Sequence, residues 1–412
     1  MKVIGKADAV VVGGGAAGLM CAYQAAARGL QIVLLDGNRQ LGRKVRITGK
    51  GRCNLTNACT IQDFMKNIPS DGRFLYSALN RFSPADVMAF FEEHGVPVKT
   101  ERGARVFPVS DNANDVADCL ACLCRDAGIT VVRSRADSIL LDAGHVSGVH
   151  TPEGVYSCAA AALCTGGLSY PLTGSDGAGY KMARILGHTV SGLRPSLVPL
   201  ESNDPWCAHL QGFSLKNVTL RAYENNTLIY SELGEMLFTH FGVSGPLVLS
   251  ASAHMRAFDH AAYRLEIDLK PGLDEQKLDA RILRDFAASP NRTLGNVMPI
   301  LTGRSMAPVI LELAGVSGET PVNSVTHAQR TAIRQILKAF PVSVKGTRSI
   351  DEAIITAGGV STREVDPRTM GSKIVPGLYF AGEILDLDAY TGGFNLQIAW
   401  STGFVAGNSI FV

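Results

Sequence analysis

Ala9-Val10-Val11-Val12-Gly13-Gly14-Gly15-Ala16-Ala17-Gly18 and, shortly after it, Ile32-Val33-Leu34-Leu35-Asp36-Gly37 are the stretches that decide the fold. Their pattern predicts a buried strand, a glycine turn, a helix and a second strand that ends in an acid. A dinucleotide site requires this order, and the acid stands at about the expected 20-residue distance. The glycines alone would also fit an ordinary tight turn, so the prediction depends on the elements around them.

Each part of this stretch has a predicted role. Gly13 permits the tight turn, Gly15 lets the backbone approach a pyrophosphate, and Gly18 lets the helix pack closely against the strand. The N-terminal N–H groups of the helix point at the phosphates, and Asp36 can accept a hydrogen bond from a ribose hydroxyl. The pattern does not distinguish FAD from NAD. The residues expected to bind the cofactor here are Gly13, Gly15, Ala16, Ala17, Gly18, Asp36 and Gly37.

Length and composition narrow the protein class. The chain has 412 residues, enough for two or three domains, and a formal net charge of +2 with both signs mixed, so we expect no nucleic-acid partner. The longest run of small apolar residues, 158–164, is too short to cross a membrane, and no membrane partner is expected. Nine cysteines and a strand close to the N-terminus predict a cytoplasmic protein with reduced thiols. The oligomeric state stays open.

A segment rich in glycine and cations, 37–57, follows the first unit. We expect it to be a loop, because the pattern is too irregular for a helix or a strand. Its cations would make the loop electropositive, which suits a diphosphate or a reduced, anionic flavin. A solvated basic loop is the alternative. The cations are Arg43, Lys44, Arg46, Lys50 and Arg52.

Two motifs in this segment resemble a known family. Gly42-Arg43-Lys44 and Thr48-Gly49-Lys50-Gly51-Arg52-Cys53-Asn54-Leu55-Thr56-Asn57 resemble the BaiN/YhiN-like flavoproteins, also called the aminoacetone oxidase family of FAD-binding enzymes. The resemblance covers essentially the whole chain. It implies FAD, with the loop lying along the cofactor toward the isoalloxazine ring. The loop residues assigned to the cofactor in this way are Arg43, Lys44, Gly51, Arg52, Cys53 and Asn54.

Later segments return to the same cofactor. A buried strand at 159–163 enters a glycine turn, as in two-motif flavoproteins, where a residue such as Ala136 would lie near the adenine. Residues 377–383 resemble the ribityl-contacting motif, and Gly392-Gly393 opens a helix whose N-terminus can stabilise charge at flavin N1 and O2. The further residues expected at the cofactor are Ala136, Thr165, Gly166, Gly382, Glu383, Asn395, Leu396, Gln397 and Ile398.

The pattern of polar and apolar residues changes near residue 191. Alternating segments at 217–223 and 263–269 predict antiparallel strands, and 274–288, 306–314 and 326–340 predict helices. We therefore expect an α/β protein: a Rossmann-type two-motif FAD-binding domain (1–190 and 346–412) with an inserted antiparallel β-barrel (191–272) and a helical subdomain of the insert (273–345).

Neither a metal nor a cysteine redox pair is expected. Cys119, Cys122 and Cys124 fall on a predicted helix that scatters them over different faces. Cys53 and Cys59 have five residues between them, and helical spacing would place them on opposite sides, beyond disulfide reach. A second strand–GxGxxG–helix–acid unit is absent from the sequence, so NAD(P)H could act only as a transient reductant.

The predicted function is that of an FAD-dependent oxidoreductase, which transfers hydride between flavin N5 and an organic substrate. The family resemblance implies two activities: reduction of a C=C bond conjugated to a ketone in a steroid or bile acid, which we favour, and oxidation of a small amine. His240 and Tyr170 are catalytic candidates by residue type only. A flavin-binding sensor whose insert docks a partner is the alternative from another class.

Overall fold

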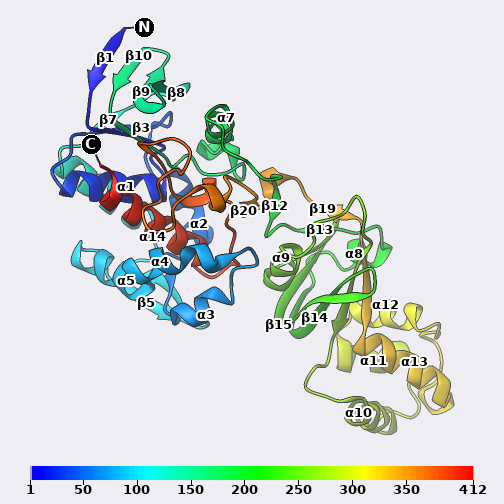
Figure 1. Cartoon of the computed structure of the whole chain (residues 1–412). Coiled ribbons are helices and arrows are strands. Elements are labelled where there is room, and N and C mark those ends of the chain that lie inside the picture. Colours follow the sequence, from blue (N-terminus) through cyan, green and yellow to red (C-terminus); the bar gives the residue numbers. More distant parts are fainter. Residues whose placement is uncertain (1, 412) are drawn as a thin grey trace. The chain divides into compact units, whose positions relative to one another are not determined.

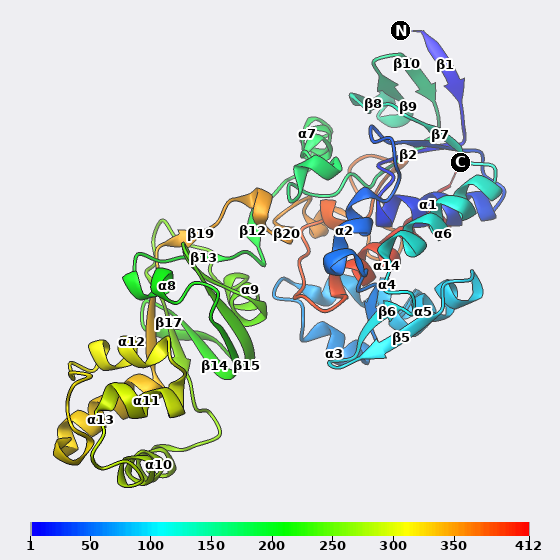
Figure 2. The same cartoon turned by 180° about the vertical axis from the view of Figure 1, so that it is seen from behind.

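The chain forms two compact units. The computed structural model describes residues 2–411 (Figures 1 and 2). Unit 1 comprises Met1–Ser196 and Ile350–Val412, and unit 2 comprises Leu197–Ser349. The sequence pattern had placed these divisions at 190/191 and 345/346. Unit 2 is therefore an insertion into a unit that both ends of the chain build.

A five-stranded parallel sheet forms the centre of unit 1. Its strands are ordered β21-β11-β2-β3-β7. Every residue of β2, β3, β11 and β21 is buried, which explains their continuous apolar sequences. The bounds are β2 Ala9–Val12, β3 Ile32–Leu35, β7 Thr130–Val132, β11 Ala160–Leu163 and β21 Leu378–Phe380.

Helices α1 (Ala16–Ala27) and α14 (Phe394–Ser409) pack against each other beside this sheet. Glycines make their close approach possible. A Cβ at Gly403 would lie 2.4 Å from the carbonyl oxygen of Ala17, and one at Gly407 would lie 2.3 Å from that of Cys21. The two helices thus meet backbone to backbone at two points one turn apart.

A second, mixed sheet covers the other side of the parallel sheet from α1 and α14, as Figure 1 shows. It consists of β8 (Ser138–Asp142), β9 (His145–Thr151) and β10 (Gly154–Ser157), with β1 (Val3–Lys6) paired parallel to β10. The remaining elements of unit 1 are α3 Ile61–Met65, α4 Tyr76–Arg81, α5 Pro84–Glu93, α6 Ala113–Asp126 and α7 Ala178–Ile185, with short strands β4 Thr56–Asn57, β5 Val98–Glu101, β6 Arg105–Pro108, β12 Arg194–Ser196 and β20 Ile355–Ala357.

The segment expected to be a loop contains a helix, so that prediction is wrong. Helix α2 spans Arg43–Gly51, although Thr48, Gly49 and Lys50 have non-helical backbone angles. Its Arg46 side chain donates to Asn114 and Asp118 on α6. Tertiary contacts to α6 compensate for a sequence with little intrinsic helical pattern.

Unit 2 is built on a seven-stranded antiparallel sheet in the order β18-β17-β14-β15-β16-β13-β19. The ladders of the described residues do not close into the expected barrel. The two edge strands are nevertheless consecutive in the chain, with only Lys345 between them, so one bent segment serves both edges of a curled sheet. The bounds are β13 Leu200–Glu201, β14 Ser214–Glu224, β15 Thr227–Thr239, β16 Gly242–Ser244, β17 Tyr263–Asp268, β18 Phe340–Val344 and β19 Gly346–Thr347.

Four helices stand between β17 and β18 as the predicted helical part of the insert: α10 Glu275–Ala287, α11 Leu294–Thr302, α12 Met306–Leu313 and α13 His327–Lys338. The sequence pattern missed α11, which contains Pro299. A capping box at Thr326 and Gln329 begins α13. Two further short helices of unit 2 are α8 Pro205–His209 and α9 Pro246–Ser252.

Residues 2–411 contain neither a membrane-spanning helix nor a group of metal-binding side chains. None of their helices combines the length and the apolar character needed to span a membrane. Their His, Cys, Asp and Glu side chains also form no group of three or more that could hold a metal ion.

We expect Gly403→Ala to lower the free energy of unfolding by about 1–3 kcal/mol, because its methyl group would press on the backbone of α1. Urea unfolding of the purified protein measures this change. Gly272→Ala is the matched control, since no atom lies within 4 Å of a Cβ there. Equal stability of the two variants would contradict the backbone contact.

Buried His188 predicts a pH dependence of stability. Its Nε2 lies 2.9 Å from Ser372 Oγ, and burial lowers its pKa below 6.5 although Glu364 partly opposes this shift. As the pH falls below about 6.5, His188 binds a proton in the unfolded chain but stays neutral in the folded chain. The free energy of unfolding therefore decreases. Urea unfolding between about pH 5 and 7.5 should show a weaker dependence in His188→Gln. Identical slopes would contradict the assignment.

Candidate flavin site

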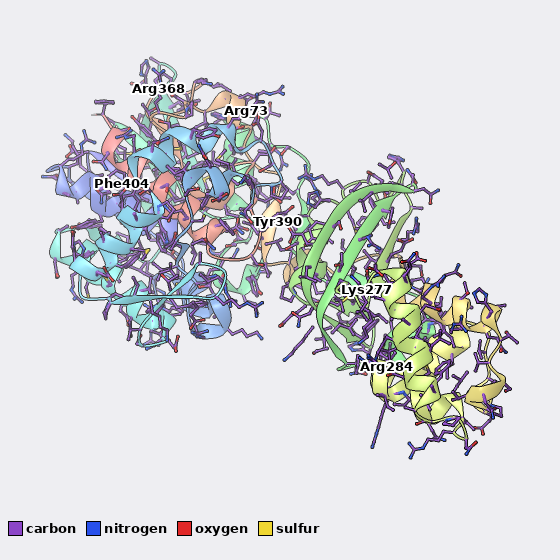
Figure 3. All side chains as sticks on the ribbon, turned by 90° about the horizontal axis from the view of Figure 1, so that it is seen from below. Arg73, Lys277, Arg284, Arg368, Tyr390 and Phe404 are labelled. Carbon is purple, nitrogen blue, oxygen red and sulfur yellow. The ribbon has the colours of Figure 1, made fainter. Side chains whose placement is uncertain are left out.

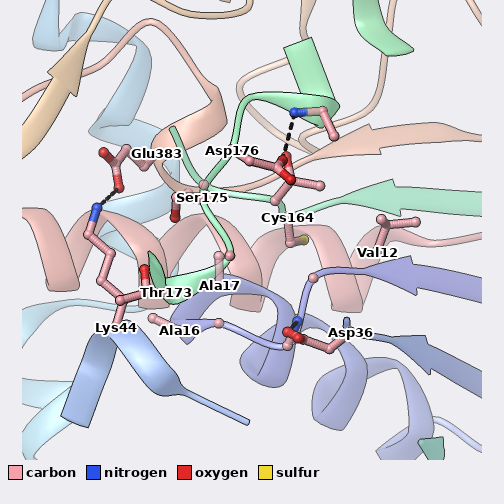
Figure 4. Close-up of a pocket in the computed structure, with 18 of the residues that line it drawn as sticks. Val12, Ala16, Ala17, Asp36, Lys44, Cys164, Thr173, Ser175, Asp176 and Glu383 are labelled. Atoms are coloured by element: carbon pink, nitrogen blue, oxygen red, sulfur yellow. Dashed lines mark hydrogen bonds and ion pairs between the residues drawn. The ribbon is translucent and has the colours of Figure 1, made fainter. Parts of the chain in front are cut away.

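One cavity of about 520 Å³ lies at the carboxyl ends of the parallel strands of unit 1. Its size falls in the range of small-molecule and cofactor sites, and its position is where ligands bind in open α/β sheets. Segments from the whole of unit 1 form its walls, including the turn after β2, the start of α2, the turn after β11, the segment before α7 and the start of α14. Figure 4 shows part of this wall.

The three glycines of the first turn have different structural roles. Gly13 has a φ of +103°, and a Cβ there would lie 2.5 Å from the carbonyl oxygen of Cys164, directly after β11. A Cβ at Gly18 would lie 1.8 Å from Gly13 O, so Gly18 brings helix and strand together. Gly15, by contrast, lines the cavity and has no atom within 4 Å of a Cβ position. Only Gly15 therefore leaves room for a ligand to approach the backbone.

Asp36 lies at the end of β3 with its carboxylate at the cavity. Gly14 N donates to its Oδ2 and Asn38 N donates to its Oδ1, both at 2.7 Å. These bonds hold the carboxylate in place, and each oxygen keeps a second lone pair for a ribose hydroxyl. The arrangement suits the adenosine half of a dinucleotide.

Another part of the cavity wall contains a partly buried ion pair (Figure 4). Lys44 Nζ on α2 lies 2.6 Å from Glu383 Oε2, and it also donates to Ser169 Oγ at 2.7 Å. The other oxygen of Glu383 accepts from Ser169 Oγ and from Thr356 N. Four segments distant in sequence are thus joined by charge-assisted hydrogen bonds at the wall.

The residues of the cavity fit a bound dinucleotide. Gly15 and Asp36 both line it, Gly15 with open space around its Cβ position and Asp36 with carboxylate oxygens that can accept from a ribose hydroxyl. The start of α14 lies at the wall through Asn395 and Leu396, and its cap residue is Gly393. A helix N-terminus favours an anionic group beside it, such as a reduced flavin ring.

Most of the residues expected from the sequence lie together at this cavity. Those that line it are Gly13, Gly15, Ala16, Ala17, Asp36, Gly37, Arg43, Lys44, Ala136, Thr165, Gly166, Gly382, Glu383, Asn395, Leu396 and Ile398.

Six expected residues lie outside the cavity wall. Gly18 packs helix to strand, as described, and Gly51 is the last residue of α2, with a φ of +83°. Arg52 is held by Glu101 and Asp111 and stacks on Phe107 at 4.2 Å, so its charge is already paired. The other three are Cys53, Asn54 and Gln397.

The side chains of these three have other surroundings. Cys53 is fully buried, and burial raises the pKa of its thiol to about 12, so it is not a thiolate at neutral pH. Gln397 bonds to Thr56, Phe82 O and Ser401 within the core. Asn54 Oδ1 is buried and has no partner in the described chain.

The two catalytic candidates do not line the cavity either. His240 is an exposed residue of unit 2 that packs on Phe241. Tyr170 is 36% exposed, and its ring lies 5.8 Å from Lys44 Nζ. The cavity brings neither side chain into its wall.

Sequence reasoning missed a polar group at the cavity formed by Arg135, Asp176 and Lys181. Arg135 Nη1 lies 2.6 Å from Asp176 Oδ2, and Asp176 also accepts from Ala178 N at the start of α7. The glycine-rich stretch 174–179 was the available signal, because such a turn before a helix brings backbone close to a ligand.

The family model described as "HI0933-like protein Rossmann domain" matches residues 7–409. The chain belongs to this family. The resemblance found in the sequence motifs is thereby confirmed, and the fold is that of a Rossmann-type FAD-binding domain in an FAD-dependent oxidoreductase family.

Two curated relatives match over nearly their full lengths. The ribosomal RNA dihydrouridine synthase of Escherichia coli strain K12 is 30% identical over 410 residues, 98% of each chain. The 3-dehydro-bile acid delta(4,6)-reductase of Clostridium scindens is 29% identical over 405 residues, 97% of this chain and 98% of the relative.

Solved flavoenzymes share the fold at lower identity. A 3-ketosteroid-delta4-(5alpha)-dehydrogenase from Rhodococcus jostii RHA1 matches 99% of this chain and 97% of its own, with a TM-score of 0.52 and 15% identity. A flavocytochrome c3 fumarate reductase matches 99% of this chain and 78% of its own, with a TM-score of 0.50 and 16% identity. Together with the open Gly15 and the carboxylate of Asp36 at the cavity, this fold fits FAD as the cofactor.

Gly15→Leu should abolish the bound flavin spectrum of the purified protein, because the added side chain would enter the cavity that the cofactor fills. No protein atom lies within 4 Å of the Cβ, so the melting temperature of the flavin-free protein should change little. Gly272→Leu, at a loop glycine of unit 2 with equally open space, is the control. A yellow Gly15→Leu protein would contradict the placement of the cofactor.

Proposed function

We propose that this protein is an FAD-dependent reductase of a C=C bond conjugated to a carbonyl group. The observation that carries the proposal is the shared chemistry of its two full-length relatives. A dihydrouridine is a uridine whose ring C=C bond, conjugated to a carbonyl, has been reduced. The named delta(4,6) bonds of a 3-dehydro bile acid are likewise conjugated to a ketone. Both named activities therefore concern the same type of bond, a C=C bond conjugated to a carbonyl group.

The cavity supports this chemistry by the charges that it places around a flavin. When bound, FAD would supply the ring that accepts hydride and then donates it. Residues Gly15 and Asp36 would hold its adenosine diphosphate half, and Lys44 with Glu383 would fix the wall near the ribityl chain. The N-terminus of α14 would stabilise negative charge that accompanies reduction. The chain thereby orients the cofactor and favours its reduced state.

We further propose NAD(P)H as a reductant that binds transiently. The five-stranded parallel sheet carries one dinucleotide turn, which the first cofactor would occupy. The reductant would then need only brief access to the ring before the organic substrate takes its place. Oxidation of a small amine, the other activity that the family resemblance implies, stays a prediction.

Two substrate classes follow from the relatives. A small steroid-like enone is the class that the sequence favoured, together with a small-molecule partner and no nucleic acid. The name of the E. coli relative adds a uracil ring within RNA as a second class. The expectation of no nucleic acid relied on the net charge of +2, on the mixing of both signs along the chain and on the lack of a basic run in the sequence. None of these excludes a local cluster of cations that the fold assembles from distant segments.

Anaerobic mixing tests the reaction. We expect NADH or NADPH to bleach the flavin absorbance, and a conjugated enone or a uridine-containing RNA to restore it with formation of the saturated product. Mass spectrometry would detect the gain of two hydrogens. The flavin-free Gly15→Leu protein serves as the control. Failure of every enone and every RNA to reoxidise the reduced flavin would overturn the proposal.

A further inference from the structure

Unit 1 carries a cluster of exposed residues that the cofactor cavity does not use. We call it the basic face. Its members come from two segments, 73–81 and 363–373, and are Arg73, Tyr76, Arg81, Arg363, Arg368 and Lys373.

Hydrogen bonds hold the two segments of the basic face together. Arg81 Nη1 donates to the carbonyl oxygen of Arg368 at 2.7 Å. Lys373 Nζ donates to that of Arg363 at 2.9 Å, and Arg363 lies close enough to Asp71 to influence its pKa. Arg73 and Arg368 lie along the same edge of unit 1 in Figure 3. The cations therefore form one continuous surface.

Most of the charge on the basic face is not neutralised. Among residues 2–411, Arg73 is the one member that forms an ion pair, an exposed contact with Asp71 at 2.8 Å. The neighbouring carboxylates form no ion pair with a cation of the basic face in the described chain: Glu364 accepts from Thr189 N and faces His188, and Asp366 accepts from the backbone N–H of Arg368. The cations that remain for an external anion are Arg81, Arg363, Arg368 and Lys373.

An exposed aromatic ring belongs to the same short segment as two of these cations. Tyr76 begins helix α4, between Arg73 and Arg81 in the chain, and is 46% exposed. Cations that track a phosphate backbone, with an exposed ring on which a base can stack, are what single-stranded nucleic-acid sites combine. A lipid headgroup or a free phosphate ion would use the cations alone.

The basic face adjoins the cavity through neighbouring residues of the chain. Ser70 Oγ bonds to both the N–H and the C=O of Asp388, next to the cavity residue Leu387. Asn67 O accepts from Tyr390 N, and Asn395 on the cavity wall bonds to Ala389. From Ser70 to Arg73 the chain can span at most about 10 Å. A strand bound on the basic face would thus pass close to the reacting end.

We infer that the basic face binds the sugar–phosphate backbone of a single RNA strand, so that one of its bases can reach the cavity. This inference deepens the proposed reductase by assigning its substrate class. The net charge of the whole chain conceals such a surface, because its cations and anions nearly cancel elsewhere.

Fluorescence anisotropy with a labelled oligouridine of about 12 nucleotides tests the inference on the flavin-loaded protein. We expect the double variant Arg363→Glu, Arg368→Glu to weaken binding at least tenfold and to reduce the salt dependence of log K by about 1.4, since each lost phosphate contact contributes about 0.7. Tyr76→Ala should weaken binding about tenfold and leave the salt dependence unchanged.

The matched control is Lys277→Glu, Arg284→Glu, an equal charge reversal on helix α10 that Figure 3 also labels. It should retain wild-type affinity. Melting temperature and flavin absorbance verify that each variant is folded. Equal losses in both double variants, or no binding by the wild type, would overturn the inference. The inference would also be overturned if the double variant of the basic face lost binding to phosphatidylserine vesicles and kept its binding to oligouridine. The anisotropy assay measures binding without turnover, whereas the anaerobic mixing experiment measures the reaction. Failure of the reductase proposal is therefore distinguishable from failure of this inference.

Discussion

Backbone-to-backbone contact around the first glycine turn is the constraint on which unit 1 depends. Gly13 touches the backbone of Cys164 directly after β11, Gly18 touches Gly13, and Gly403 of α14 touches Ala17 of α1. No side chain fits at these points, since even a methyl group would overlap a carbonyl. The central strand, its neighbour and both long helices are therefore fixed relative to one another. The cavity opens where this tight packing ends, at Gly15.

Residues far apart in the chain complete the site. Lys44 and Glu383 are 339 positions apart and meet across the cavity wall. Strand β21 pairs with β11 only after the chain has passed through unit 2, so unit 1 is not complete until its last segment has been added. The insertion does not disturb the sheet, because it leaves after β12 and returns before β20, and these two strands pair with each other.

Charged residues were the hardest to assign from sequence. The motif around Arg52 marks the family correctly, yet its guanidinium is paired with Glu101 and Asp111 rather than placed at the cavity. Lys44, a few residues earlier, does reach the cavity. A sequence pattern records that cations gather, but the partner that each one finds depends on strands β5 and β6, which approach from elsewhere. The basic face could not be predicted from the sequence for the same reason, because its two segments are far apart in the chain: Arg81 and Arg368 are separated by 287 positions.

The sequence by itself determined the parallel sheet, the glycine turn with Asp36, and the family, because these depend on local pattern: buried β-branched runs, glycines at fixed spacing and an acid at a strand end. Only the tertiary structure decided that α2 is a helix, that the ladders of the insert stay open, and which expected residues line the cavity. These features depend on contacts between distant segments, where packing and ion pairing outweigh local preference. Gly15 and Gly18 illustrate the division: the same residue type at neighbouring positions, one left open for a ligand and the other closed by a helix.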